Sequence, residues 1–232
     1  MTSRPDLFSA VHKGLRALMF DTLHLLSRCD PSDDFDVERT AHQLRALVRL
    51  CERHLHDENT FIHPSLDARR PGLVWEAAEA HDAQAQYATD FLRLATRLES
   101  PGVAQRASLL RSLIGKLSEF IAHQLVHMHL EETRHTPALH ETHTDDELHA
   151  MHRAIVSSIP ADELALFLRW MVPALSHGER VELLTGLRAA PSPEPFHGAL
   201  ALARAHLAPR DFAKLCEALG VRVPSVQNAR AA

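Results

Sequence analysis

The chain has 232 residues, 45 % of them hydrophobic and 24 % charged, with a formal net charge of −5 when the histidines are neutral. This length allows one sizeable core with an appended subdomain. Because the basic residues are dispersed and the balance is acidic, we expect no nucleic-acid partner. No apolar segment approaches the about 20 residues of a membrane span, so we expect no membrane association and a cytoplasmic location.

Composition predicts an all-α protein. Glycine is scarce at 8 residues and aromatic residues make up 5 %, so helix formers outweigh strand formers along the chain. The 3 cysteines form no Cys-x-x-Cys pair and leave one thiol over, which argues against a disulfide scaffold.

The first two predicted helices each carry a histidine on their apolar face. The first is expected to begin at Pro5 and to run to about residue 28, with His12 on its apolar stripe. Ser32 or Asp33 caps the second, which is expected to end before Pro64.

The third and fourth predicted helices repeat this logic. The third begins at Pro71, carries His81 among alanines, and stops near Pro101. The fourth spans about residues 103–134 and carries His127. Four long helices with short connections pack most simply as an up-down-up-down bundle.

A sequence pattern occurs twice on these helices: His-x-His-x-Glu, followed by proline six residues after the glutamate. The two copies are His54 to Glu58 with Pro64, and His127 to Glu131 with Pro137. A second copy at these spacings would arise by chance roughly once in two hundred chains of this composition. A lone histidine precedes each copy, His12 and His81 respectively.

The spacing indicates metal binding. Residues four apart on an α-helix lie about 40° apart around the axis and about 6 Å along it, so one helix can direct His54 and Glu58 at one ion. Imidazole nitrogen with carboxylate oxygen suits iron, manganese or zinc, and a carboxylate can bridge two ions. Four imidazoles with two carboxylates therefore predict a dinuclear centre, with iron favoured.

The other histidines lack this support. His56 and His129 lie about 200° around their helices from His54 and His127, so they are expected outside the site. Glu132, His24 and His42 are expected at the surface. A further cluster is assigned to a linker and a new helix: His135, His140, His143, His149 and His152.

These residues resemble the hemerythrin-like, His-His-Glu cation-binding family over about residues 5–137. The resemblance is carried by His12, His54 with Glu58, the segment Phe61-Ile62-His63-Pro64, His81, and His127 with Glu131. It implies a four-helix bundle around a non-haem di-iron centre, bridged by the two glutamates and a solvent-derived oxo or hydroxo group.

One departure from the family matters. The oxygen-carrying hemerythrins place two histidines one turn apart on the third helix, whereas Ala77 and Ala85 lie four residues either side of His81. A centre with fewer imidazoles leaves more open positions, which favours sensing, redox chemistry or iron-dependent regulation over reversible oxygen storage. Whether His123, one turn before His127, replaces the missing ligand is left open.

The chain is predicted to change character after the bundle. We expect a hemerythrin-like domain over residues 1–143, a helical module over 144–220 and a disordered tail over 221–232. Thr144 and Ser176 are predicted helix caps, and the module is expected to pack on the bundle or bind a protein partner.

Three functions remain. The favoured one is a di-iron protein that senses or handles dioxygen, nitric oxide, peroxide or iron. The alternatives are a di-iron oxidase or peroxidase, so enzymatic activity stays open, and a metal-free helical interaction protein. Inward-facing carboxylates on both repeats disfavour the last.

Overall fold

The computed structural model describes residues 4–100, 102–190 and 192–222, so most of the predicted tail lies outside the described residues. Its four long helices are α1 (Ser9–Arg28), α2 (Asp34–Asp57), α4 (Trp75–Leu98) and α5 (Val103–Leu130). No strand occurs within these ranges. The predicted all-α class is confirmed.

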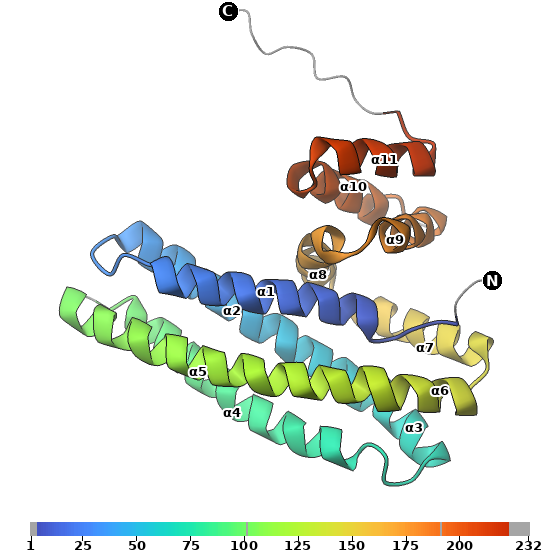
Figure 1. Ribbon diagram of the computed structural model, residues 1–232, viewed down its shortest axis with the longest axis horizontal. Coiled ribbons are helices and arrows are strands. Elements are labelled where there is room, and N and C mark those ends of the chain that lie inside the picture. The colour runs from blue at the N-terminus through green and yellow to red at the C-terminus, as the bar shows by residue number, and fades with distance from the viewer. Residues whose placement is uncertain (1–3, 101, 191, 223–232) are drawn as a thin grey trace, which may run out of the picture.

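The four long helices form the predicted bundle (Figure 1). Each packs against the next along the chain, and α5 closes the ring against α1. Their inward faces share one core of leucine, valine and phenylalanine side chains, including Leu18, Leu47, Phe91 and Leu113, which are all almost fully buried.

Aspartate side chains accept backbone N–H groups where the first two helices begin. Asp6 Oδ1 accepts hydrogen bonds from the backbone N–H groups of Phe8 and Ser9, so α1 begins after the predicted start at Pro5. Asp33 caps α2 by accepting from the Phe35 N–H. Both carboxylates satisfy N–H groups that have no partner within the helix.

The second and fourth predicted helices do not end where expected. Each passes through a wide π turn, η1 (Glu58–Ile62) or η2 (Glu131–His135), and continues as α3 (His63–Arg69) or α6 (Thr136–Thr142). The prediction that the second helix ends before Pro64 was therefore wrong. Proline inside an α-helix lacks an N–H and clashes with the carbonyl four residues earlier. Inserting one residue as a π turn just before Pro64 or Pro137 relieves that conflict.

Within the described residues, five helices follow the bundle: α7 (Asp145–Ser158), α8 (Ala161–Ala174), α9 (His177–Ala189), α10 (Glu194–His206) and α11 (Pro209–Leu219). The helix caps predicted at Thr144 and Ser176 are both present, and each forms a capping box. Helix α7 packs on η1, α8 lies across α1 and α2, and α9, α10 and α11 pack with α8 around a second core (Figure 1). Helix α8 therefore belongs to both cores.

The contact between α1 and α8 depends on a glycine. A Cβ atom at Gly14 would lie 3.1 Å from the backbone nitrogen of Met171 and 2.7 Å from its Cγ. Both Met171 and its neighbour Trp170 pack against the bundle core. The absence of a side chain at Gly14 thus lets α8 approach the α1 backbone.

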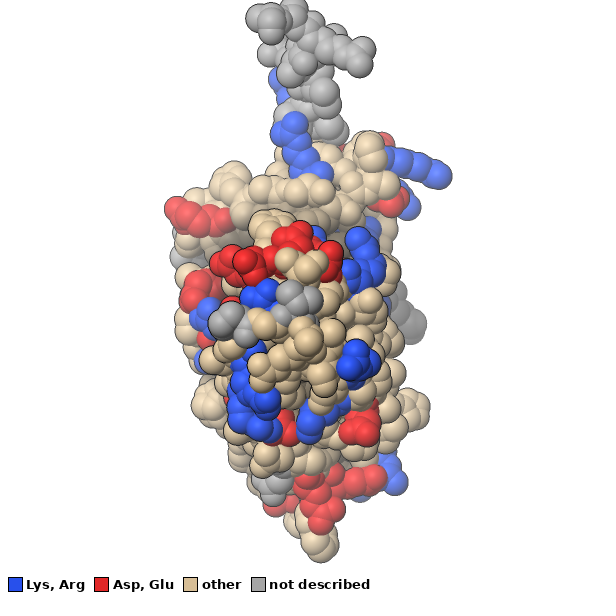
Figure 2. Space-filling model, turned by 90° about the vertical axis from the view of Figure 1, so that its left-hand side faces the viewer, with Lys and Arg blue, Asp and Glu red and all other residues tan. Residues whose placement is uncertain are grey.

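Charge on the surface is mixed in sign. On the face shown in Figure 2, basic and acidic side chains alternate without a large patch of one kind. No helix within the described ranges is long and apolar enough to cross a membrane.

Candidate metal centre

The six residues singled out in the sequence converge at one end of the bundle. Each of the four long helices contributes one histidine, and each glutamate is the first residue of a π turn. The members are His12 from α1, His54 from α2, Glu58 from η1, His81 from α4, His127 from α5 and Glu131 from η2. All six are buried.

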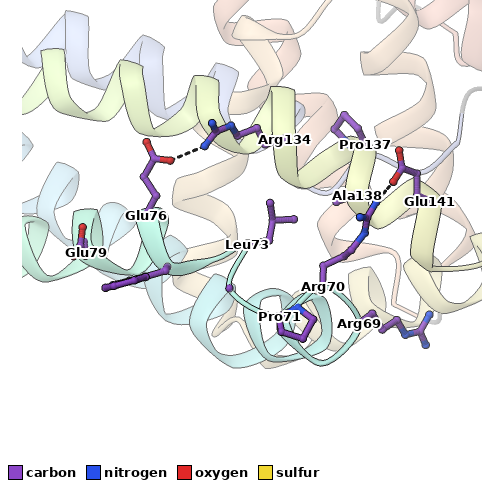
Figure 3. A pocket seen from close by; sticks show the side chains of 12 residues that line it. Arg69, Arg70, Pro71, Leu73, Glu76, Glu79, Arg134, Pro137, Ala138 and Glu141 are labelled. Carbon is purple, nitrogen blue, oxygen red and sulfur yellow. Dashed lines mark hydrogen bonds and ion pairs between the residues drawn. The ribbon is translucent and has the colours of Figure 1, made fainter.

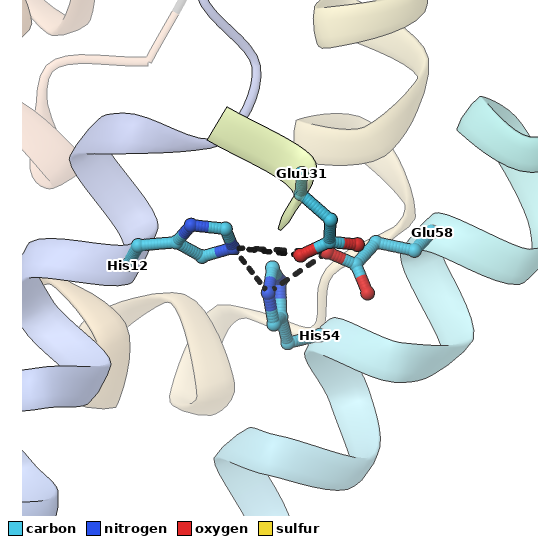
Figure 4. A group of neighbouring side chains, drawn as sticks. All are labelled: His12, His54, Glu58 and Glu131. Atoms are coloured by element: carbon cyan, nitrogen blue, oxygen red, sulfur yellow. Dashed lines mark hydrogen bonds and ion pairs between the residues drawn. The ribbon is translucent and has the colours of Figure 1, made fainter. Parts of the chain in front are cut away.

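One half of the cluster joins α1 and α2 (Figure 4). The Nε2 atoms of His12 and His54 are 3.1 Å apart. His54 Nε2 lies 2.9 Å from Glu58 Oε1, and His12 Nε2 lies 3.4 Å from Glu131 Oε2. Two nitrogens and two carboxylates therefore face a common point.

The other half joins α4 and α5 in the same way. The Nε2 atoms of His81 and His127 are 3.2 Å apart. His81 Nε2 lies 3.4 Å from Glu58 Oε2, and His127 Nε2 lies 3.4 Å from Glu131 Oε2. Glu58 thus directs one oxygen toward each half, which is the disposition of a bridging carboxylate.

These donors fit cations better than they fit one another. Two nitrogens bound at right angles to an ion about 2.1 Å away lie about 3.0 Å apart, close to the separation within each histidine pair. Both oxygens of Glu58 and of Glu131 are buried without a well-formed hydrogen bond, and the two residues are 1 % and 0 % exposed. Burying two carboxylates this way is costly unless cations neutralise them.

A second layer of side chains orients two of the imidazoles. His12 Nδ1 donates to Glu132 Oε1 at 2.9 Å, and Arg16 Nη1 donates to the same oxygen at 2.8 Å. His81 Nδ1 donates to Asn59 Oδ1, also at 2.9 Å. Each bond leaves the Nε2 lone pair free to face a cation. Glu132, which we expected at the surface, is partly exposed, with 24 % of its side chain accessible, and it also contacts the buried His12 ring.

When no metal is bound, a proton on His12 balances part of the negative charge of the glutamates in the cluster. Burial disfavours the charged imidazole of His12, but the neighbouring carboxylates of Glu131, Glu132 and Glu58 favour it and raise the pKa of His12 to about 10. Burial opposes ionisation of Glu58 too, yet the attraction of the surrounding histidines holds the pKa of this carboxyl well below its usual range. Burial lowers the pKa of His127, which therefore stays neutral.

Metal affinity should consequently rise with pH well beyond the usual range for histidine. Because the pKa of His12 is about 10, the imidazole carries an extra proton below that pH, and a metal ion must displace this proton to bind. The competition weakens as the pH rises from 6.5 toward 10. Titration calorimetry near pH 7.5 in buffers of different ionisation enthalpy should detect about one proton released per cluster filled. Equal apparent enthalpies in all buffers would contradict this prediction.

The structure adds two histidines that the sequence interpretation did not assign to the site. His63 Nε2 lies 3.8 Å from Glu131 Oε1, and the His63 ring stacks on His81 with centroids 5.0 Å apart. His135 is 0 % exposed, and neither of its nitrogens has a hydrogen-bond partner within the described part of the chain. His63, His135 and Glu131 form a third group with metal-ligand spacing.

The π turns explain why these two residues were missed. His63 follows Glu58 by five residues. In an α-helix this spacing would point His63 away from the site, whereas a π turn places it on the same face as Glu58. His135 had been grouped with the histidines of a linker, yet it ends η2. The sequence signal that accompanies both residues is a proline: Pro64 directly follows His63, and Pro137 stands two positions after His135.

The remaining candidates lie outside the cluster. His56 and His129 are exposed, as their angular positions predict, and His24 and His42 are exposed as well. His123 is also exposed and contacts the Tyr87 ring at 5.9 Å between centroids, so it does not replace the imidazole absent from α4.

A wide surface groove of about 930 Å³ lies at the same end of the bundle (Figure 3). Two ion pairs cross it, Arg134 with Glu76 and Arg70 with Glu141. Because these two ion pairs cross it and it is open to solvent, the groove does not show the features of an enclosed ligand site.

Comparison with known proteins agrees with the residue pattern. The model of the hemerythrin HHE cation binding domain matches residues 5–139. The chain is also 24 % identical over 187 residues to the zinc finger protein BRUTUS-like of Arabidopsis thaliana. That match covers 79 % of this chain but only 15 % of the plant protein. No solved structure matches the chain significantly.

Proposed function

The chain belongs to the hemerythrin HHE cation-binding family, and on that basis we propose that it is a non-haem di-iron protein that senses or handles dioxygen, nitric oxide, peroxide or iron. We propose His12 and His54 as ligands of one ion and His81 and His127 as ligands of the other, with Glu58 and Glu131 shared. The observation that carries this proposal is the set of four buried carboxylate oxygens without well-formed hydrogen bonds.

The protein side chains would supply position and charge for this chemistry. When bound, an iron pair would provide one-electron redox chemistry and open coordination positions for a small ligand. Glu132 and Asn59 fix the rings of His12 and His81, so that both present Nε2 to the centre. His63 and His135 border Glu131 with ring nitrogens that could serve as further ligands beside the four imidazoles.

The sensing role also agrees with the arrangement of the C-terminal helices. Helix α1 carries His12 and packs directly against α8, the helix shared with the second core. A change at the centre that shifts α1 would therefore reach residues 144–220, the module that we propose as a surface for a protein partner. We propose a cytoplasmic location for the protein.

The direct test is metal content combined with an ultraviolet-visible spectrum. Protein produced with adequate iron should carry about two irons per chain, with charge-transfer bands in air that disappear on anaerobic reduction. Air should then oxidise the reduced protein without recovery when oxygen is removed. Occupancy by one zinc that iron cannot replace would refute the di-iron assignment. Reversible oxygenation would favour a carrier, and multiple-turnover peroxide consumption would favour an enzyme.

A paired substitution tests the ligand assignment. His54→Ala should lose at least one of the two irons, because it removes a nitrogen that faces the cluster. His56→Ala should retain both, because that exposed side chain points away. Iron quantified by plasma emission on folded, monodisperse protein provides the measurement, and the opposite pattern would contradict the proposed site.

A further inference from the structure

A third set of donors lies beside the proposed iron pair, where the two π turns end. His63 is the first residue after η1, and His135 is the last residue of η2. A ring nitrogen of each lies within 4.8 Å of the other and of an oxygen of Glu131. Among the described residues, neither histidine belongs to a ligand group that contains one of the four imidazoles of the pair. The set therefore marks a separate position.

Glu131 directs its two oxygens to different places. Its Oε2 lies 3.4 Å from His12 Nε2 and 3.4 Å from His127 Nε2. Its Oε1 instead lies 3.8 Å from His63 Nε2, which is too long for a hydrogen bond. One oxygen can thus serve the iron pair while the other serves a further ion, because a carboxylate can bridge metal ions.

The donors of this set lack other partners. His63 is 5 % exposed and His135 is 0 % exposed. His63 Nε2, Glu131 Oε1 and both nitrogens of His135 make no well-formed hydrogen bond within the described part of the chain. The Phe8 ring beside His135, with centroids 6.2 Å apart, offers no acceptor in its plane. Buried polar groups are nearly always hydrogen-bonded, so this concentration of unpaired atoms indicates a partner from outside the chain.

The chemistry of the set favours a cation as that partner. Two imidazoles with one carboxylate bind zinc or ferrous iron in many proteins and leave coordination positions open. Donors that are about 2.1 Å from one ion lie about 3.0–4.2 Å apart, depending on the angle, and the separation of 3.8 Å between His63 and Glu131 falls in this range. A water molecule would not offset the charge of the buried carboxylate.

We propose that His63, His135 and Glu131 bind a third divalent transition-metal ion, with positions left open for solvent. This site goes beyond the iron pair and shares only Glu131 with it. Three protein donors hold the third ion, and the pair repels it at short range, so we expect it to bind more weakly than the irons. Purified protein should therefore carry about two irons, and added metal should fill the third site.

Cobalt(II) is the probe, because it accepts the same donors as zinc and ferrous iron and is counted separately from iron. Iron-loaded full-length protein dialysed against Co²⁺ should gain about one cobalt per chain and keep its iron, with both metals quantified by plasma emission. X-ray absorption at the cobalt edge should show scattering from two imidazole rings.

Substitution of either histidine provides the specific test. His63→Leu and His135→Leu should each weaken cobalt binding by more than about tenfold, because even hydrogen-bond partners of metal ligands contribute roughly 10- to 100-fold to affinity. Both variants should fold and keep their iron, since each removes buried nitrogen without a partner.

His143→Gln is the matched control. His143 is 5 % exposed but lies outside every ligand group of the described residues, and its Nε2 is 2.9 Å from Ser65 Oγ. This variant should gain cobalt as the wild type does.

Three results would overturn the third site: no cobalt gained beyond displaced iron, wild-type cobalt affinity in both leucine variants, or bound cobalt without imidazole ligands. A pocket that holds only water would give the first of these. Failure of the iron pair is a distinct result. If the protein carries no iron, the wild type should still bind about one cobalt more than His135→Leu, which would refute the di-iron assignment and uphold the third site.

Discussion

Removing the bound metal is expected to lower the melting temperature by about 10 °C or more. An ion present at 1,000 times its Kd contributes about 4 kcal/mol to stability, and each kcal/mol corresponds to about 2–4 °C in a chain of this size. Emptying the site leaves Glu58 and Glu131 buried with only the proton on His12 as compensation. Thermal unfolding with and without a strong chelator provides the measurement.

The control for this result removes the charges themselves. In the double variant Glu58→Gln with Glu131→Gln, neutral amides cannot bridge two cations, so the protein should hold little metal and its melting temperature should not respond to the chelator. Because the two oxygens of Glu58 face different halves, Glu58→Gln alone should weaken both ions. A wild-type melting temperature that is insensitive to chelation would argue against a structural metal centre.

Replacing Gly14 is expected to destabilise the protein by about 3 kcal/mol, the upper part of the usual range for overpacking a well-packed contact. In Gly14→Leu the new side chain would collide with the backbone of Met171, and α8 cannot retreat without separating both cores. Urea denaturation followed by circular dichroism gives the free energy of unfolding.

The same substitution at another helical glycine should act in the opposite direction. Gly115 is exposed on α5, and a Cβ atom there would meet nothing within 4 Å. Gly115→Leu should therefore stabilise the protein by roughly 0.5–1 kcal/mol through helix propensity alone. Equal effects at the two positions would show that close approach of α8 is not what Gly14 provides.

Local signals in the sequence predicted much of the fold. Asp33, Thr144 and Ser176 cap helices where expected, because a capping side chain acts on N–H groups within three residues of itself. The convergence of four histidines and two glutamates was also predictable, since a repeated i, i+4 spacing places both members of each pair on one helical face.

Features that depend on longer-range packing were not predictable. Pro64 was taken as the end of a helix, whereas η1 carries the chain past it. No rule for α-helices could place His63 or His135, because their orientation comes from a turn of different period. The close approach of α8 to Gly14 involves residues more than 150 positions apart, and a helical glycine alone does not reveal which helix will lie over it.

The paired π turns also determine where this chain can change in length. Deleting Thr60 would restore an α-helical turn and rotate everything beyond it by about 100° relative to Glu58. His63 would leave the centre, and the apolar face that α3 packs beneath α7 would turn toward water. The connection between α4 and α5 has no such constraint, since it holds no residue of the centre. Insertions and deletions among relatives should therefore be rare between each glutamate and its following proline, and common in the connection at the far end of the bundle.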